Sequence, residues 1–306
     1  MNSKHILLSP PHMGGTEPTY IAQAFQDNWI APAGPHIDLF ENRLVDFLDE
    51  KSQVVALNSG TAAIHLGLLL LGVQKDDVVL CQSLTFIASV NPVLYLGATP
   101  VFIGSEKETW NLCPIALEEA ILNQLHKGIQ PKAIVVVHLY GMPAKMNEII
   151  TISKKYNIPI LEDAAEALGS AYQGKPCGTL GDFGVFSFNG NKIITTSGGG
   201  ALICHSEIDK KKAVFLATQA KEDAAHYEHM QVGYNYRMSN VAASIGLGQL
   251  EVLSEHIQHR KQNHLFYKQL FENLSEVTLH QEPNENFISN HWLTVIQLAS
   301  FEQREA

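Results

Sequence analysis

The chain has 306 residues, of which 45% are hydrophobic, 17% charged and 8% aromatic. This length and composition are typical of a globular protein with one large α/β domain and a smaller lobe. The formal net charge of −10 and the pI of about 5.7 argue against nucleic acid as the main partner, because phosphate backbones are bound by clustered basic side chains. A phosphorylated cofactor is still compatible with this charge, since backbone N–H groups can bind phosphate.

The four cysteines are far apart and form no CxxC pair, which indicates free thiols in a reducing cytosol. No metal site is predicted. The N-terminus has too short an apolar stretch for a signal peptide, and the longest apolar run, Leu66 to Val73, is less than half as long as a membrane span. We therefore expect a cytoplasmic protein that makes no contact with a membrane.

Strand-like and helix-like segments alternate through the first half of the chain. This order predicts a mostly parallel central sheet sandwiched by helices, with ligands beyond the carboxyl ends of the strands. The predicted strands are Gln53–Leu57, Val78–Cys81, Pro100–Ile103, Ala133–Val137 and Ile158–Leu161, and the predicted helices are Thr61–Leu71, Phe86–Leu96, Ile115–His126 and Lys145–Tyr156.

The pattern changes beyond Gly181. Two further strands are predicted at Gly184–Phe188 and Gly200–Cys204, and a long helix from Ser239 to about Phe271. The strand-like segment His291–Leu298 follows. We expect a large domain over residues 1–240 and, over residues 241–306, the long helix with a truncated small C-terminal domain.

The segment Asn58-Ser59-Gly60-Thr61-Ala62-Ala63 follows a predicted strand and opens a helix. Small residues let the backbone approach an anion, and the first-turn N–H groups then bind phosphate with the help of the helix dipole. Ser59 and Thr61 are also common helix-capping residues, so this motif alone leaves both roles open.

The segment Leu161-Glu162-Asp163-Ala164-Ala165-Glu166 places an acid just past a buried strand. If Asp163 faces a pyridine nitrogen, its carboxylate keeps that ring protonated, and a protonated ring is an electron sink. A role as the cap of the next segment is equally compatible with the sequence.

The segment Phe186-Ser187-Phe188-Asn189-Gly190-Asn191-Lys192 places a lysine five residues after a strand end. A partly desolvated lysine in such a loop can lose its proton and condense with an aldehyde. Most lysines are solvated surface groups, but Ser187 and the neighbouring glycines favour a reactive one here.

The segment Gly233-Tyr234-Asn235-Tyr236-Arg237-Met238 precedes the long helix. A tyrosine-rich turn more often packs than reacts. Its polar members Asn235 and Arg237 are candidates for anion contacts, which can reach across a dimer interface.

The order of these four motifs resembles the DegT/DnrJ/EryC1/StrS family of sugar aminotransferases, which have the aspartate-aminotransferase fold and bind pyridoxal phosphate. The stretch SFNGNKIITTSGGG is the most specific part of this resemblance. The segments SPPHMGG, from Ser9, and NWIAP, from Asn28, are similar to the UDP-4-amino-4,6-dideoxy-sugar aminotransferases of the bacillosamine pathway.

The resemblance implies a role for each matching residue. Lys192 would carry the cofactor as a Schiff base and act as acid and base, with pyridoxamine phosphate as the second cofactor form. Asp163 would pair with the pyridine nitrogen, and Glu166 would lie beside the ring hydroxyl. The other implied cofactor contacts are Gly60, Thr61, Phe86, Ser187 and, from a partner subunit, Asn235; the implied substrate contacts are Asn28, Trp29, Ile30, Ala31, Gly60, Ser187 and Arg237.

The implied reaction moves an amino group from glutamate to C4 of a UDP-linked 4-keto-6-deoxy sugar of the N-acetyl type, for surface glycans or protein glycosylation, in a homodimer with shared active sites. The chain stops about 80 residues short of the usual family length, so a weakly active or non-catalytic binding protein is an alternative. A sugar dehydratase of the same family is another, although those enzymes replace the lysine by histidine. An amino-acid enzyme such as a cysteine desulfurase is disfavoured by the N-terminal segments.

Overall fold

The structure is a computed structural model that describes residues 7–48 and 51–305. Residues 1–6, part of the N-terminal stretch considered above for a signal peptide, and the outer limits 1 and 306 of the expected domains lie outside the described residues. Within the described ranges, no helix is both long and apolar enough to cross a membrane.

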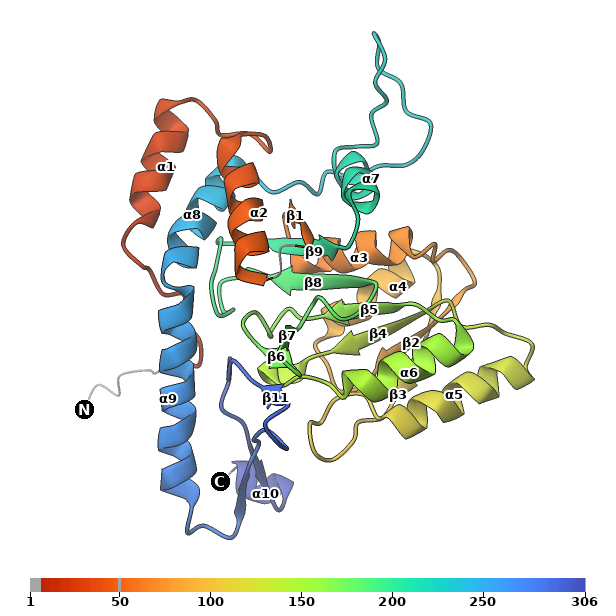
Figure 1. Ribbon diagram of the computed structural model, residues 1–306, viewed down its shortest axis with the longest axis vertical. Helices are drawn as coiled ribbons and strands as arrows, with labels where there is room; N and C mark the ends of the chain where they lie inside the picture. Colours follow the sequence, from red (N-terminus) through yellow and green to blue (C-terminus); the bar gives the residue numbers. More distant parts are fainter. Residues whose placement is uncertain (1–6, 49–50, 306) are drawn as a thin grey trace.

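A seven-stranded sheet forms the centre of the molecule (Figure 1). Its strand order is β1-β9-β8-β5-β4-β2-β3, and β9 alone runs antiparallel to the others. The predicted mostly parallel sheet is therefore confirmed. The strands are β1 (Gln53–Leu57), β2 (Val78–Gln82), β3 (Thr99–Ile103), β4 (Ala133–Val137), β5 (Ile160–Asp163), β8 (Phe183–Ser187) and β9 (Gly200–Cys204).

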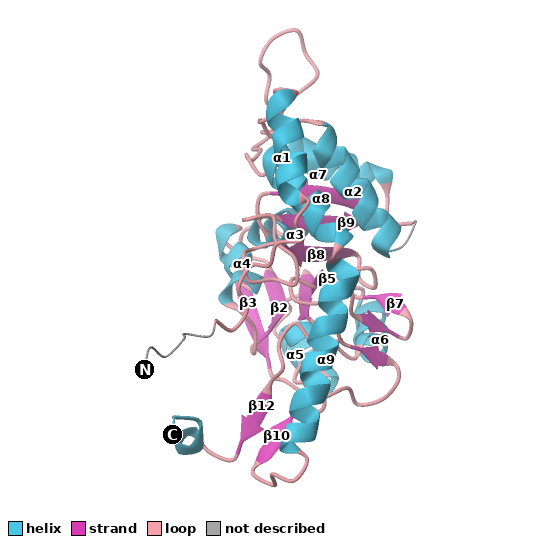
Figure 2. Cartoon of the chain, turned by 90° about the vertical axis from the view of Figure 1, so that its left-hand side faces the viewer, coloured by secondary structure: helices cyan, strands magenta, loops and turns pink. Residues whose placement is uncertain are grey.

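Helices cover both faces of this sheet (Figures 1 and 2). One face carries α3 (Gly60–Leu70), α4 (Asn91–Tyr95) and α7 (Glu207–Ala217). The opposite face carries α5 (Pro114–His126) and α6 (Met146–Tyr156), and further along the sheet α2 (Pro35–Leu48) and α8 (Asn240–Glu251). Helix α1 (Glu17–Gln26) packs against α8.

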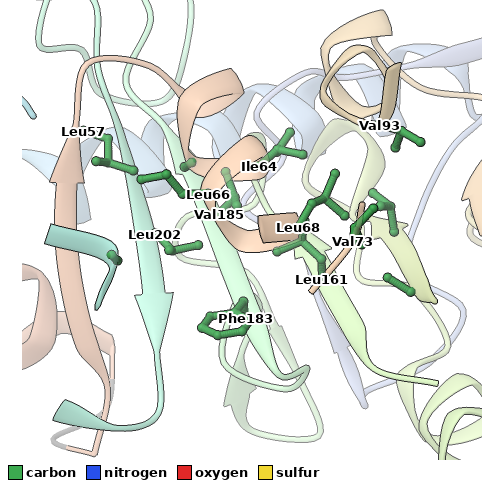
Figure 3. Packing of buried hydrophobic residues seen from close by; sticks show 14 of the residues in the cluster. Leu57, Ile64, Leu66, Leu68, Val73, Val93, Leu161, Phe183, Val185 and Leu202 are labelled. Carbon is green, nitrogen blue, oxygen red and sulfur yellow. The ribbon is translucent and has the colours of Figure 1, made fainter. Parts of the chain in front are cut away.

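Alternate strand residues separate the core into these two layers. Val135 and Leu161 point to the α3 face, whereas Ile134 and Ile160 point to the α5 face. This alternation follows from the two-residue period of a strand, and both sets are apolar because both faces are covered. Figure 3 shows the α3-side cluster, with Leu66 and Leu68 of the helix over Leu161, Val185 and Leu202.

Three predicted elements differ from the structure by more than small shifts of their ends. The expected helix Phe86–Leu96 is a 3-10 turn, η1 (Ile87–Ser89), followed by the short α4, because Pro92 has no N–H to continue a preceding helix. The long helix is divided at Val252, whose backbone leaves helical geometry at φ −108° and ψ 3°, into α8 and α9 (Leu253–Phe271). Of the segment His291–Leu298, only β12 (Ile296–Leu298) is a strand.

The C-terminal segment runs beside α9 and back under the main sheet (Figure 1). Strand β10 (Val277–Leu279) pairs with β12, and β11 (Phe287–Ile288) joins the small sheet of β6 (Ala171–Tyr172) and β7 (Lys175–Pro176). A last helix, α10 (Phe301–Glu305), follows. The division into domains near residue 240 stays a prediction.

Candidate active site

A cavity of about 310 Å³ opens near the carboxyl ends of β5 and β8 and at the start of α3. In sheets of this kind, that edge is where ligands bind. The cavity brings together seven side chains or backbone positions that the sequence predicts for the site, and these are Gly60, Thr61, Phe86, Asp163, Glu166, Ser187 and Lys192.

The N-terminus of α3 forms one wall of the cavity. The Ser59 side chain caps the helix by accepting a hydrogen bond of 3.0 Å from the Ala62 N–H. The N–H groups of Gly60 and Thr61 belong to the first turn, where no intrahelical carbonyl is available to them. Ser187 faces this turn from the end of β8, and a Cβ at Gly60 would lie 3.0 Å from its Cβ. The wall is therefore suited to an anionic group such as a phosphate.

Asp163 is the last residue of β5 and is only 5% exposed. Its Oδ2 accepts a hydrogen bond from the Ser89 hydroxyl at 2.5 Å, and its Oδ1 accepts one from the Ala165 N–H at 3.1 Å. The two donors fix the orientation of the carboxylate, which can also accept a hydrogen bond from a protonated ring nitrogen in the cavity. Ser89 comes from η1, and no motif of the sequence predicted it for the site.

Lys192 enters the cavity from the loop between β8 and β9, and its side chain is 12% exposed. Its Nζ lies 3.3 Å from Glu166 Oε1 and 4.4 Å from the centre of the Trp292 ring. The Trp292 indole N–H donates to the Asn191 carbonyl at 2.7 Å, which ties the ring to the lysine loop. Trp292 is a second lining residue that no motif of the sequence predicted.

Glu166 is held from two sides. Besides Lys192, the Tyr140 N–H donates to its Oε2 at 2.7 Å, and Tyr140 has the left-handed φ of 57° that aims this N–H. Burial raises the pKa of the Glu166 carboxyl, although Lys192 and the Tyr140 N–H act in the opposite direction. The positive charge of Lys192 therefore offsets part of the cost of burying the charged Glu166 carboxylate.

Phe86 lines the mouth of the cavity and is 69% exposed. It precedes η1 with an extended backbone at φ −69° and ψ 139°. An exposed aromatic face at this position is suited to cover one side of a flat ring.

The remaining predicted residues do not line this cavity. Asn235 is exposed, with its carbonyl accepting a hydrogen bond of 3.1 Å from the Asn58 side chain. Arg237 instead forms a partly buried ion pair with Glu41 and donates to the Ala56 carbonyl at 3.0 Å. The segment Asn28–Ala31 follows α1 and is held by Asn240, whose side-chain amide donates to the Trp29 carbonyl at 3.0 Å.

The arrangement fits a flat, phosphorylated cofactor that carries an aldehyde. It offers an anion-binding helix terminus, a buried carboxylate, an aromatic cover and a lysine in one cavity, and these groups match the phosphate, ring nitrogen, ring face and aldehyde of pyridoxal phosphate in turn.

Comparison with known proteins gives relatives along the whole described chain. EpsN of Bacillus subtilis (strain 168), named as a candidate pyridoxal phosphate-dependent aminotransferase, is 51% identical over 295 residues, which are 96% of this chain and 76% of EpsN. The GDP-perosamine synthase of Escherichia coli O157:H7 is 37% identical over 302 residues, which are 99% of this chain and 80% of that enzyme.

A comparison with solved structures also gives an aminotransferase. The candidate sugar aminotransferase Spr1654 from Streptococcus pneumoniae, in its PLP form, superposes with a TM-score of 0.89 at 28% identity, covering 99% of this chain and 81% of that one. The comparisons thus confirm three predictions from the sequence: the fold, the aminotransferase activity and the use of pyridoxal phosphate. The model of the DegT/DnrJ/EryC1/StrS aminotransferase family matches residues 11–306, and the chain belongs to this family.

Proposed function

We propose that this enzyme transfers an amino group from glutamate to C4 of a UDP-linked 4-keto-6-deoxy sugar of the N-acetyl type. The observation that carries this proposal is that Lys192 and Asp163 line one cavity together with the N-terminus of α3. The nucleotide and the sugar come from the resemblance of the SPPHMGG and NWIAP segments to bacillosamine-pathway enzymes, and a role in surface glycans or protein glycosylation goes with them.

Each residue of the cavity has a task in this reaction. When bound, the pyridoxal ring draws electrons away from the carbon that loses its proton. Asp163 would hold a proton on the ring nitrogen, and Gly60, Thr61 and Ser187 would bind the phosphate. Phe86 would cover the ring face, and Glu166 would lie beside the ring hydroxyl.

Lys192 has two tasks. It would bind the cofactor covalently until the amino group of glutamate displaces it. The freed Nζ would then take a proton from the α-carbon of glutamate and, in the second half of the reaction, deliver a proton to C4 of the sugar. Glu166, 3.3 Å away, keeps the amine directed into the cavity.

The residues outside the cavity would act in a homodimer. Asn235 would reach the phosphate of the partner subunit's cofactor, while Asn28, Trp29, Ile30 and Ala31, together with Arg237, would contact the sugar nucleotide at the shared site. The exposure of Trp29 and Ile30 supports this arrangement, because exposed large apolar side chains often mark an interface.

The test is a glutamate-dependent assay on UDP-linked and GDP-linked 4-keto-6-deoxy sugars. The wild type should convert the UDP sugar, and Lys192→Ala should lose at least about 1,000-fold in rate. Lys175→Ala, which alters an exposed lysine on β7, is the matched control. Retained turnover in Lys192→Ala would refute the assigned role of the lysine, and conversion of the GDP sugar alone would refute the choice of nucleotide.

A further inference from the structure

Three side chains that commonly bind metals meet between α9 and the C-terminal segment, and none of them lines the cavity. They are His264 on α9, Glu282 after β10, and His291 after β11, and their potential ligand atoms all lie within 4.8 Å of one another. His264 and His291 are 4% and 8% exposed, and Glu282 is partly buried. The group is therefore a buried cluster and not a set of surface acids.

The cluster is only partly satisfied by its own hydrogen bonds. His291 Nε2 and Glu282 Oε1 are 2.9 Å apart, and the two imidazole rings stack with centroids 3.8 Å apart. His264 Nδ1 is buried and has no hydrogen-bond partner among the described residues. Because a buried polar atom without a partner costs free energy, such an atom calls for a ligand.

A second unpartnered nitrogen lies close by in sequence. His280 Nε2, two residues before Glu282, is also buried without a partner, and the ring of His280 stacks on Trp110 at 4.1 Å. Three buried side-chain nitrogen or oxygen atoms lack partners in the part of the chain that the structure describes, and two of the three belong to His264 and His280.

We propose that His264, Glu282 and His291 bind a zinc ion. Imidazole nitrogen and carboxylate oxygen are ligands that zinc takes in tetrahedral sites, and water can complete the set. Calcium and magnesium prefer oxygen ligands, so two imidazoles select a transition metal instead.

The ligands need only a local adjustment. Neighbouring ligands of tetrahedral zinc are about 3.4 Å apart for metal–ligand distances of about 2.1 Å. His291 Nε2 and Glu282 Oε1 are already closer than this. The His264 ring must tilt out of its stack so that its nitrogen converges with theirs, which a side-chain rotation can supply.

Such an ion would join α9 to the segment that leads into the active site. His291 is followed directly by Trp292, whose ring lies under Lys192 Nζ. Bound zinc would therefore act as a structural cross-link that fixes this tryptophan beneath the reactive amine.

The test is zinc binding to the cofactor-free protein, measured by competition with a chromophoric chelator. Wild type and His259→Gln, an exposed histidine on the same helix, should each bind one zinc ion per chain with equal affinity. His264→Gln and Glu282→Gln should each bind at least about tenfold more weakly. Circular dichroism checks that each variant is folded, and Glu282→Gln keeps the shape of the site should His264→Gln unfold.

Cobalt gives a second readout. In the wild type and in His259→Gln, cobalt should produce the visible absorption bands of a four-coordinate site, and these bands should be lost in Glu282→Gln. Absence of zinc binding in the wild type, or equal affinity in Glu282→Gln and His259→Gln, would overturn the proposal. Because no cofactor or substrate takes part, neither result depends on the aminotransferase reaction.

Discussion

Among the residues that line the cavity, acidic side chains outnumber basic ones. Asp163 and Glu166 both line it, and Lys192 is the one ammonium group among its lining residues. The negative charge of Asp163 adds to burial in raising the pKa of Glu166. An excess of negative charge favours protonated nitrogen atoms, which is the state that a pyridine ring needs to withdraw electrons.

Glu166 should make the stability of the protein depend on pH. Because its pKa is raised in the folded state, the folded chain binds more protons than the unfolded chain between pH 4.5, the ordinary pKa of a glutamate side chain, and the folded pKa. The contribution of this group is full below 4.5 and is lost as pH rises through the folded pKa. Glu166→Gln does not titrate, so its stability relative to wild type should increase with pH across this window and then level off. Urea unfolding of the cofactor-free proteins between pH 4.5 and 8 measures this difference.

An exposed glutamate provides the control for this titration. Glu119→Gln, on the solvent side of α5, should show no such trend relative to wild type. A stability difference for Glu166→Gln that is flat in pH, or that falls as pH rises, would contradict the raised pKa.

The sequence predicts a site residue where the residues next to it in the chain form a recognisable motif. Lys192 and Asp163 each follow a buried strand and stand among small residues, and both line the cavity. Ser89 and Trp292 were not predicted because their roles depend on residues far away in the chain. Ser89 donates to Asp163, 74 residues away, and Trp292 donates to Asn191, 101 residues away. A serine in a turn and a tryptophan in a loop have no local pattern that predicts such partners.

The same distinction holds for whole elements. The strands β1, β4 and β9 coincide with the predicted ranges, because short apolar segments between turn residues are unambiguous. Helices α1 and α2 were not predicted. The break between α8 and α9 was not predicted either, because the residue at the break is Val252 and not a glycine or proline. A Cβ added at Gly14 would lie 3.1 Å from the Val252 side chain, so the break coincides with a close approach of the Gly14 backbone.

The start of α3 is held in place by β9, and this contact can be tested. A Cβ at Gly200 would lie 2.4 Å from the Gly60 nitrogen and 2.4 Å from the Ser59 carbonyl carbon, both backbone atoms. Gly200→Ala must therefore push the first turn of α3 away from β9 and out of line with Ser187. We expect a loss of about 1–3 kcal/mol in unfolding free energy and weaker binding of pyridoxal phosphate.

Two measurements separate these effects. Urea unfolding gives the stability, and the absorbance of bound cofactor during titration gives its affinity. Gly104→Ala is the matched control, because a Cβ there meets no atom within 4 Å. If Gly200→Ala bound the cofactor as well as Gly104→Ala does, the close contact would not position the phosphate-binding turn.

At the scale of the molecule, the side chain of Asn290 holds the C-terminal segment to the loop after β5. The Asn290 side-chain amide donates to the carbonyls of Glu166 and Leu168, at 2.9 Å each, and its Oδ1 accepts from the Trp292 N–H at 2.8 Å. The same residue thus connects the loop after β5, which carries Glu166, to the tryptophan beneath Lys192. A position 124 residues from Glu166 in the chain thereby supports the active site.

Asn290→Ala removes these three hydrogen bonds and leaves buried backbone groups without partners. We expect a loss of about 1–3 kcal/mol in unfolding free energy, since each unsatisfied buried group carries a desolvation cost. Trp292 should also lose its fixed place, so limited proteolysis should cut the chain sooner between α9 and β12. Asn286→Ala, an exposed asparagine in the same segment, should leave both stability and cleavage rate unchanged. Equal cleavage in the two variants would mean that Asn290 does not hold the segment, and that apolar packing around Phe287 and Trp292 is sufficient to hold it against the sheet.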